Sequence, residues 1–295
     1  MKKIDIVLQG PYTDFTDEII ERYVDLEFIN KIIISCWHGD VPSTTATGLN
    51  VVHNKDQAYQ HEKVECVRTV NDLYYSGVLN INYQLTTSLA GVKHSKNNIC
   101  GVIRSDQKYT VESMENFYNF LIENIDKIKP TIDQRWSNKN SKIPKGKIFI
   151  MGNNKRYLFH PRAWMFWGYR EDLIELYNIP LQVNEEAMKK NITKEILYFD
   201  NDYFRMCHRG ETYLGSWYCS KYDNRVIKMV ENPELYLYDH CPNKSESQTV
   251  SMDIMPRLFK SFPRTGIDLY WPKNNVNTFK GRAVLSEELW HEEGM

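Results

Sequence analysis

The sequence predicts an α/β fold in which a mostly parallel sheet is flanked by helices, followed by an elaborated C-terminal region. Short apolar runs alternate with segments of helical periodicity through the first half of the chain. Several of these runs stop abruptly at glycine or at polar residues, as buried strands do. The chain has 295 residues, of which 42% are hydrophobic, so it can build the large core that such a sheet needs.

The first elements alternate strand and helix. Residues 4–8 are an apolar run ending at Gly10 and Pro11, which predicts a first strand and not a signal peptide. Residues 16–28 predict a helix because Thr16 is a favoured N-cap and acidic residues follow it. Residues 32–35 and 49–53 are the second and third predicted strands.

The pattern continues with a helix over residues 80–93, a strand over 99–103, a helix over 111–128 and a strand over 148–151. Repeated strand–helix–strand units predict right-handed crossovers between parallel strands. Residues 131–145 are polar, with prolines near both ends, and predict a loop.

The character of the chain changes in its second half. Residues 159–177 begin with aromatic residues that we expect to pack on the core, and they end as a helix. A polar surface segment (181–194), a helix (209–222) and a short strand (235–238) are expected next. From residue 242 onward Pro, Asn, Lys and Ser accumulate, which predicts an ordered but irregular tail.

The overall composition disfavours several classes of protein. The net charge is −1 and no long basic run occurs, so nucleic acid is not favoured as a partner. Six cysteines are scattered without CxxC pairs, so neither a zinc site nor a disulfide framework is indicated. No segment approaches the roughly 18 apolar residues of a membrane span. We therefore expect a cytoplasmic, reduced location.

The most informative stretch is NICGVIRSDQKY, residues 98–109. Its apolar run stops at Arg104, Ser105 and Asp106, which places an arginine and a carboxylate at the carboxyl end of a strand. Ligands bind at that edge of open α/β sheets. A carboxylate there can hold a divalent cation, which in turn can hold a diphosphate. The alternative is a strand followed by a solvated polar turn.

Four segments, in this order and at these distances, resemble the WavE-type lipopolysaccharide-synthesis family: IDIVLQGPY, IIISCWHGD, NINYQLTTSLAGVKHSKNNICGVIRSD and GETYLGSWY. The resemblance covers mainly residues 4–106 and, more thinly, residues 160–222. Its most specific part is a set of polar and glycine positions in the third segment: Asn80, Asn82, Gln84, Ser88, Gly91, Arg104 and Asp106. Tyr83 departs from the family, which often has a basic residue there. Arg162-Ala163-Trp164 also departs from it, standing where the family often has Ser-Asp-Trp.

The resemblance implies a glycosyltransferase with a GT-A-like, Rossmann-type nucleotide-binding fold. Residues 1–145 would be the nucleotide-sugar-binding half. Residues 146–295 would be the acceptor-binding half with its C-terminal extension, in one continuous globular unit. The donor would be a nucleotide-sugar, with a UDP-sugar favoured. The acceptor would be a glycan of lipopolysaccharide, another surface polysaccharide or a glycoprotein, reached by peripheral contact where that acceptor is membrane-bound.

The candidate donor-binding residues are Gln9, Gly10, Pro11, Thr13, Asn82, Gln84, Arg104 and Asp106. Gly10 allows close approach of the backbone, and Gln9 can bind polar edges of a base or ribose. Asp106 resembles the last acid of the DxD motif of GT-A enzymes, whereas Arg104 stands where that motif has its first acid. Asp106, together with phosphate and water, would coordinate the metal, Mn²⁺ or Mg²⁺. Alternatively, Arg104 would bind the phosphate directly.

The candidate catalytic residues are Asp106 and Glu211. Glu211 fits the family's Glu-x-Tyr motif and could act as the general base on the acceptor hydroxyl. The alternative is an acidic residue that merely favours a helix N-terminus. Asp200 and Asp202 form a DxD-like pattern that a solvated loop also explains. The histidines His160, His208 and His240 could supply ligands, although a lone histidine is more often structural.

Two other functions stay open. A sugar nucleotidyltransferase would normally show a basic, glycine-rich loop after the first strand, and QGPYTDFTDE has no such basic residue. A catalytically silent family member that binds a glycan or acts as a scaffold is the third reading, which the missing first acid of the DxD motif supports.

Overall fold

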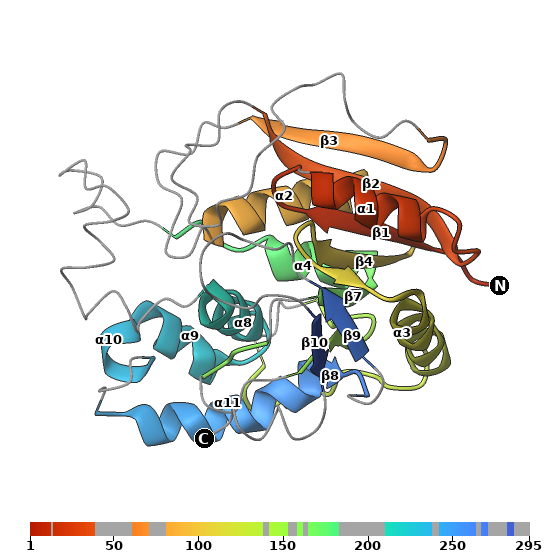
Figure 1. The fold of residues 1–295 in the computed structure, drawn as a ribbon. Helices are drawn as coiled ribbons and strands as arrows, with labels where there is room; N and C mark the ends of the chain where they lie inside the picture. Colours follow the sequence, from red (N-terminus) through yellow and green to blue (C-terminus); the bar gives the residue numbers. More distant parts are fainter. Residues whose placement is uncertain are drawn as a thin grey trace.

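The computed structural model describes residues 1–12, 14–38, 61–70, 81–137, 142–152, 158–161, 165–182, 210–237, 242–263, 267–270 and 282–285. The main element is a seven-stranded sheet with the order β3-β2-β1-β4-β7-β6-β8 (Figure 1). Its central strands are β1 (Ile4–Gln9), β2 (Ile29–His38) and β4 (Ile99–Arg104), with β3 (Val64–Val70) beside β2. These four strands are mutually parallel.

The second half of the chain extends the same sheet. Strand β7 (Met165–Tyr169) runs antiparallel to β4 and to β6 (Ile148–Ile150), and β6 is parallel to β8 (Phe259–Ser261). The predicted fold class, an α/β fold with a mostly parallel sheet flanked by helices, is therefore confirmed. One sheet takes strands from both sides of residue 145.

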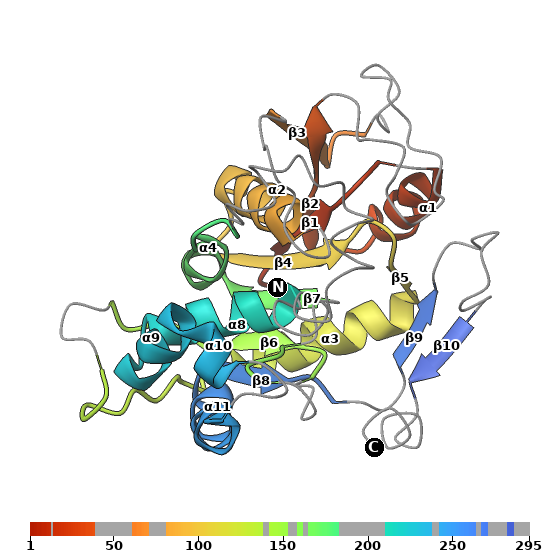
Figure 2. The same ribbon diagram turned by 90° about the vertical axis from the view of Figure 1, so that its left-hand side faces the viewer.

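Helices cover the two faces of the sheet with separate apolar cores. Helices α1 (Asp14–Tyr23) and α3 (Val111–Asn124) pack on one face, and α2 (Ile81–His94), α4 (Arg170–Tyr177) and α8 (Gly210–Ser220) pack on the other. Figure 2 shows α1 and α2 on opposite sides of β1 and β2. Alternate residues of β1 enter different cores, with Ile6 and Leu8 in one and Val7 in the other. This is the period-two pattern of a strand that is buried on both faces.

A smaller antiparallel sheet lies beside the main one. Its strands are β5 (Lys108–Tyr109), β9 (Ile267–Tyr270) and β10 (Arg282–Leu285), in the order β10-β9-β5. Since β5 follows β4 after a short turn, this sheet continues directly from the end of a central strand.

The predicted strand at residues 235–238 is wrong. Residues Pro233–Tyr236 form the short helix α10, which follows α9 (Asn224–Glu231). Pro233 stands in the first helical turn, where its missing N–H costs no hydrogen bond and its fixed φ suits the helix. A short apolar run does not by itself distinguish strand from helix.

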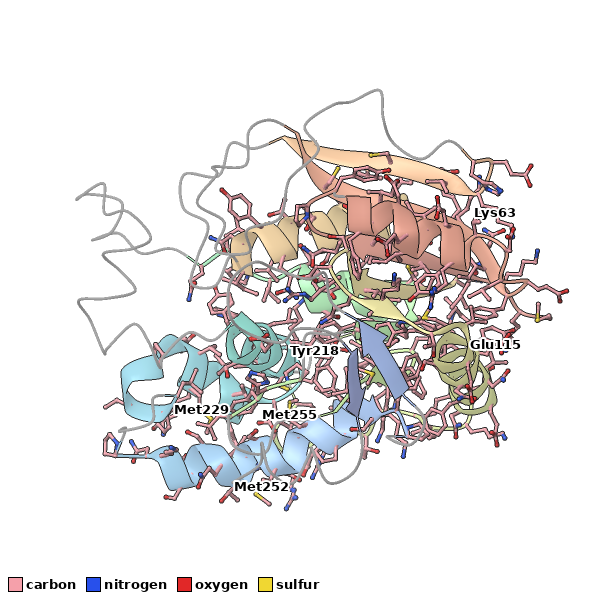
Figure 3. The ribbon with its side chains drawn as sticks, in the orientation of Figure 1. Lys63, Glu115, Tyr218, Met229, Met252 and Met255 are labelled. Carbon is pink, nitrogen blue, oxygen red and sulfur yellow. The ribbon has the colours of Figure 1, made fainter. Side chains whose placement is uncertain are left out.

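The predicted irregular tail after residue 242 is wrong as well. Residues Lys244–Leu258 form helix α11, whose buried side chains include Val250, Ile254 and Leu258 at four-residue spacing. Figure 3 shows Met229 and Met255 among helices α8, α9 and α11, while Met252 points outward. Accordingly, Met255 is 4% exposed and Met252 is 78% exposed. This apolar stripe outweighs the polar composition of the segment, because packing of one face provides most of a helix's stability.

Smaller differences concern the boundaries and the strands of low hydrophobicity. Helix α1 begins before Thr16, which is buried and is not the N-cap. The strand β3 was not predicted because Glu65 and Arg68 interrupt its apolar pattern. The strand β7 was expected only as an aromatic segment packed on the core. The predicted strand at 49–53 and the segment 183–194 lie outside the described residues.

Within the described part of the chain, no helix is long and apolar enough to cross a membrane.

A buried carboxylate near the sheet makes stability depend on pH. Asp172 of α4 is 3% exposed and accepts hydrogen bonds from the backbone N–H groups of Lys145 (2.9 Å) and Gly146 (2.8 Å). Burial raises the pKa of Asp172 from 3.8 to about 6, although these two hydrogen bonds oppose the shift. The folded state therefore binds more protons than the unfolded state between about pH 4 and pH 6.

The free energy of unfolding should consequently fall as the pH rises from about 4 to about 6, by up to about 3 kcal/mol from this group. Asp172→Asn cannot ionise, so the difference in unfolding free energy between wild type and variant should change by that amount over this range. Urea unfolding at a series of pH values measures it. Parallel pH profiles for the two proteins would show that Asp172 does not titrate in this way.

Candidate functional site

The carboxyl ends of β1 and β4 meet at one point of the sheet. Gln9 and Arg104 are register partners, and each is the last residue of its strand. The N–H of Ser105 donates to the carbonyl oxygen of Gln9 (2.8 Å), and its hydroxyl donates to the carbonyl oxygen of Pro11 (2.9 Å). Ser105 thus joins the two turns that follow these strands, which holds the predicted site residues Gln9, Pro11 and Arg104 together.

Gly10 makes this junction possible. Its φ is +131°, a conformation that side-chain-bearing residues rarely adopt, and a Cβ atom there would lie 2.6 Å from the Ser105 hydroxyl oxygen. Its N–H donates to the carbonyl oxygen of Ser35 in β2 (3.2 Å). In the structure it is Ser105 that packs closely against Gly10. Contact of Gln9, Gly10 and Pro11 with a donor remains a prediction.

Arg104 and Asp106 bind each other through a two-pronged ion pair. Nε of Arg104 is 2.8 Å from Oδ1 of Asp106, and Nη2 is 2.5 Å from Oδ2. The Asp106 side chain is 15% exposed, whereas that of Arg104 is 41% exposed. The guanidinium therefore reaches solvent at the edge of the sheet while it covers the carboxylate.

The charges of this pair stabilise each other. Burial alone would raise the pKa of Asp106, but the charge and hydrogen bonds of Arg104 outweigh it and lower the pKa below its usual value. The Asp106 carboxylate in turn raises the pKa of Arg104, and the charge of Glu211 adds to this effect. Both groups are therefore ionised at neutral pH, and Glu211 lies within electrostatic reach of Arg104.

Glu211 reaches this edge from the first turn of α8. Gly210 packs against Ile81 at the start of α2, since a Cβ atom at Gly210 would lie 3.3 Å from Cδ1 of Ile81. The Glu211 side chain is 25% exposed, and its Oε2 lies 3.7 Å from Nε2 of His160. Glu211 is thus within electrostatic reach of Arg104 and lies beside His160, which the sequence analysis named only as one of three histidines without an assigned role.

Asn82 has a different environment from the one expected of a donor-binding residue. It is 1% exposed; its side-chain N–H donates to the carbonyl oxygen of Gln182 (2.7 Å), and its Oδ1 accepts the N–H of Gln182 (2.7 Å). This side chain fastens α2 to the segment after α4. Gln84, two residues further along α2, is partly exposed. Thr13, Asn80, the Arg162-Ala163-Trp164 segment, Asp200, Asp202, His208 and His240 lie outside the described residues.

Two polar groups that the sequence did not single out follow Asp106 directly. Oε1 of Gln107 and the hydroxyl of Tyr109 are buried and have no hydrogen-bond partner among the described residues. Burial raises the pKa of Tyr109, and the neighbouring charges include Arg104 and Asp106. Buried polar atoms without partners are destabilising and uncommon, and they often occur at functional sites. In the sequence, the one feature that could have pointed to them is their position, one and three residues after Asp106.

The described residues offer Asp106 as a single metal ligand and contain no group of three or more His, Cys, Asp or Glu side chains that could hold a metal ion. Such a site would not suffice alone for Mn²⁺ or Mg²⁺. It could contribute one oxygen ligand if substrate phosphates and water supplied the others, as is common for Mg²⁺. The metal therefore remains a prediction.

Comparison with known proteins adds only distant structural likenesses. No family model matches the chain, and no curated protein matches it. Among solved structures, 4-diphosphocytidyl-2C-methyl-D-erythritol synthase from Anaerococcus prevotii is 10% identical with a TM-score of 0.35, over 68% of this chain and 84% of that one. CMP:2-keto-3-deoxy-manno-octonic acid synthetase complexed with CTP is 9% identical with a TM-score of 0.33, over 65% and 83% of the two chains. HddC from Yersinia pseudotuberculosis is 11% identical with a TM-score of 0.31, over 59% and 79%.

Proposed function

We propose that this protein is a glycosyltransferase that moves a sugar from a nucleotide-sugar donor to a glycan acceptor. The observation that carries the proposal is the Arg104–Asp106 pair at the carboxyl end of the central strands, with Glu211 within electrostatic reach. Sugar transfer needs positive charge at the leaving diphosphate and a base at the acceptor hydroxyl. This edge offers both kinds of group.

The residues suit distinct parts of an inverting transfer. Glu211 would take the proton of the acceptor hydroxyl as its oxygen forms the new bond to the anomeric carbon of the donor sugar. The bond from that carbon to the diphosphate oxygen breaks, and the diphosphate leaves with the electron pair. Asp106 holds the guanidinium of Arg104 through Nε and Nη2. The N–H groups of Arg104 that do not bind Asp106 would bind the leaving phosphate oxygens.

The finer assignment is supported by the resemblance to the WavE-type family. It favours a UDP-sugar as donor and a surface polysaccharide such as lipopolysaccharide as acceptor, with Mn²⁺ or Mg²⁺ at Asp106. Gln9, Gly10 and Pro11 would line the nucleotide, because they occupy the turn beside Arg104.

One observation favours a second candidate, a catalytically silent glycan-binding or scaffold member. Both carboxylate oxygens of Asp106 accept hydrogen bonds from Arg104, so the guanidinium competes with a metal ion for this carboxylate. A sugar nucleotidyltransferase is supported less well. The described residues that follow β1, from Gly10 to Tyr12, include no basic residue.

A thermal-shift panel tests the proposal. UDP, GDP, CMP, dTDP and UDP-sugars are each added with and without Mn²⁺. We expect UDP and one UDP-sugar to raise the melting temperature, because a ligand that binds only the folded state stabilises it in proportion to the logarithm of its saturation. Sugar transfer with that donor should then fall by about 10²–10⁴-fold in Glu211→Gln, which cannot act as a base. No shift with any nucleotide would support the glycan-binding alternative and contradict the transferase.

A further inference from the structure

A strained turn lies directly before His160. Phe159 has a φ of +48°, and it is the only non-glycine residue with a positive φ in the described part of the chain. The left-handed conformation is unfavourable for a bulky side chain. Such a conformation persists only where the surrounding structure enforces it.

Three contacts enforce this turn. The ring of Phe159 is fully buried in the core that includes α2, α4 and α8. Its N–H donates to the Ser251 hydroxyl on α11 (2.9 Å). Its carbonyl oxygen lies so close to α8 that a Cβ atom at Gly215 would come within 1.9 Å of it. The turn is therefore held between two helices and the sheet.

The geometry of α8 links this turn to Glu211. Glu211 and Gly215 are four residues apart, so they lie on the same face of the helix, one turn from each other. The carbonyl group of Phe159 packs against Gly215, and the imidazole of the next residue, His160, lies beside Glu211. The His160 side chain is 10% exposed, and its Nε2 lies 3.7 Å from Oε2 of Glu211. The strained turn thus places Nε2 of His160 opposite Oε2 of Glu211.

We infer that His160 is a positioning residue that orients the Glu211 carboxylate for the acceptor hydroxyl. Contact at Oε2 leaves Oε1 for the acceptor, whose proton it would take. The separation of 3.7 Å is longer than a hydrogen bond, as is common for catalytic contacts before substrate binds. This inference rests on the proposed function. It adds a residue whose part is to fix the direction of the base and not to bind the donor.

Kinetics of His160→Ala and His160→Gln test this role. We expect His160→Ala to lower kcat by about 100-fold, the size of effect expected from a base misplaced by about 1 Å. The KM for the nucleotide-sugar and the thermal shift with UDP should stay within about twofold of wild type, because Arg104 and Asp106 remain. His160→Gln should recover part of kcat, since its amide N–H can stand near the position of Nε2. In a Glu211→Gln background, His160→Ala should cause little further loss.

The exposed pair His94–Glu65 provides a matched control, because its Nε2–Oε2 distance is 2.8 Å and it lies away from the site. His94→Ala should leave kcat unchanged. Wild-type kcat in His160→Ala, or an effect that multiplies fully with that of Glu211→Gln, would overturn the inference. Equal loss in His160→Gln and His160→Ala would also overturn it, by showing that packing alone matters.

The inference can fail separately from the proposed function. If the wild-type protein neither binds a nucleotide nor transfers a sugar, the proposed function fails first. A double-mutant cycle on urea unfolding with His160→Ala and Glu211→Gln then tests the pair itself. A measurable coupling free energy would show that His160 and Glu211 interact at this edge. Additive effects of the two substitutions would show that they do not interact.

Discussion

Arg104→Ala is expected to abolish the stabilisation of this protein by UDP and to lower sugar transfer by about 10²–10³-fold, as the loss of one preorganised charge-stabilising donor does elsewhere. Arg104 is the basic group at the carboxyl end of β4, and its side chain is 41% exposed at the edge where we place the diphosphate. Alanine removes the phosphate contact and also leaves the mostly buried Asp106 carboxylate without its partner. Isothermal titration with UDP and a transfer assay measure the two effects.

Two variants make the test specific. Arg104→Lys keeps the charge but loses the two-pronged geometry, so it should recover only part of the affinity. Arg225→Ala removes a similar fork, in which Nη2 lies 2.6 Å from Asp223, at a distant position on α9. Its UDP affinity should equal that of wild type. If Arg104→Ala binds UDP as wild type does, the diphosphate does not lie at this edge.

Asp106→Ala distinguishes two hypotheses for the site: a metal ion bound by Asp106, or direct binding of the phosphate by Arg104. If a metal ion joins Asp106 to the diphosphate, the variant loses the part of UDP affinity that depends on Mn²⁺. If Arg104 alone binds the phosphate, UDP affinity depends on Mn²⁺ in neither protein, and the variant loses only the part that orientation of Arg104 by Asp106 provides.

Gly215→Ala is expected to lower the free energy of unfolding by about 3 kcal/mol or more, at the upper end of the usual cost of overpacking a core. Its Cβ atom would stand 1.9 Å from the carbonyl oxygen of Phe159 and 2.7 Å from Cδ of Pro161. Neither neighbour can yield easily, because the backbone of Phe159 is fixed by its buried ring and by Ser251. Helix α8 must therefore shift outward.

Gly168→Ala is the matched control for this prediction. A Cβ atom at Gly168 in β7 would meet the carbonyl oxygen of Lys147 at 3.5 Å and Cα of Ile148 at 3.7 Å, which are ordinary contact distances. Its unfolding free energy should change by less than about 1 kcal/mol. Urea unfolding of both variants measures the difference. Equal stability of the two would mean that α8 does not pack against the Phe159 turn as the structure has it.

The amino-acid sequence determined the central strands, several of the helices and the local order of the candidate site. Burial on both faces requires unbroken apolar runs, so β1, β2 and β4 were predictable within a few residues. The turn from Arg104 to Asp106 follows its strand directly, and the ion pair between these residues is local. Helix α3 begins after Thr110, whose side chain caps Ser113 N, a signal that is likewise contained within a few residues.

Only the tertiary structure decided which distant segments share the edge. Nothing local to Glu211 states that α8 begins beside α2, and nothing local to His160 indicates that Gly215 and Ser251 hold the turn before it. The side-chain amide of Asn82 binds the backbone of Gln182, which follows α4 and is 100 residues away in the sequence. The helical state of α11 likewise depends on the neighbours that bury its stripe. Local patterns encode caps, turns and burial, whereas contacts between distant residues arise from how the buried faces fit together.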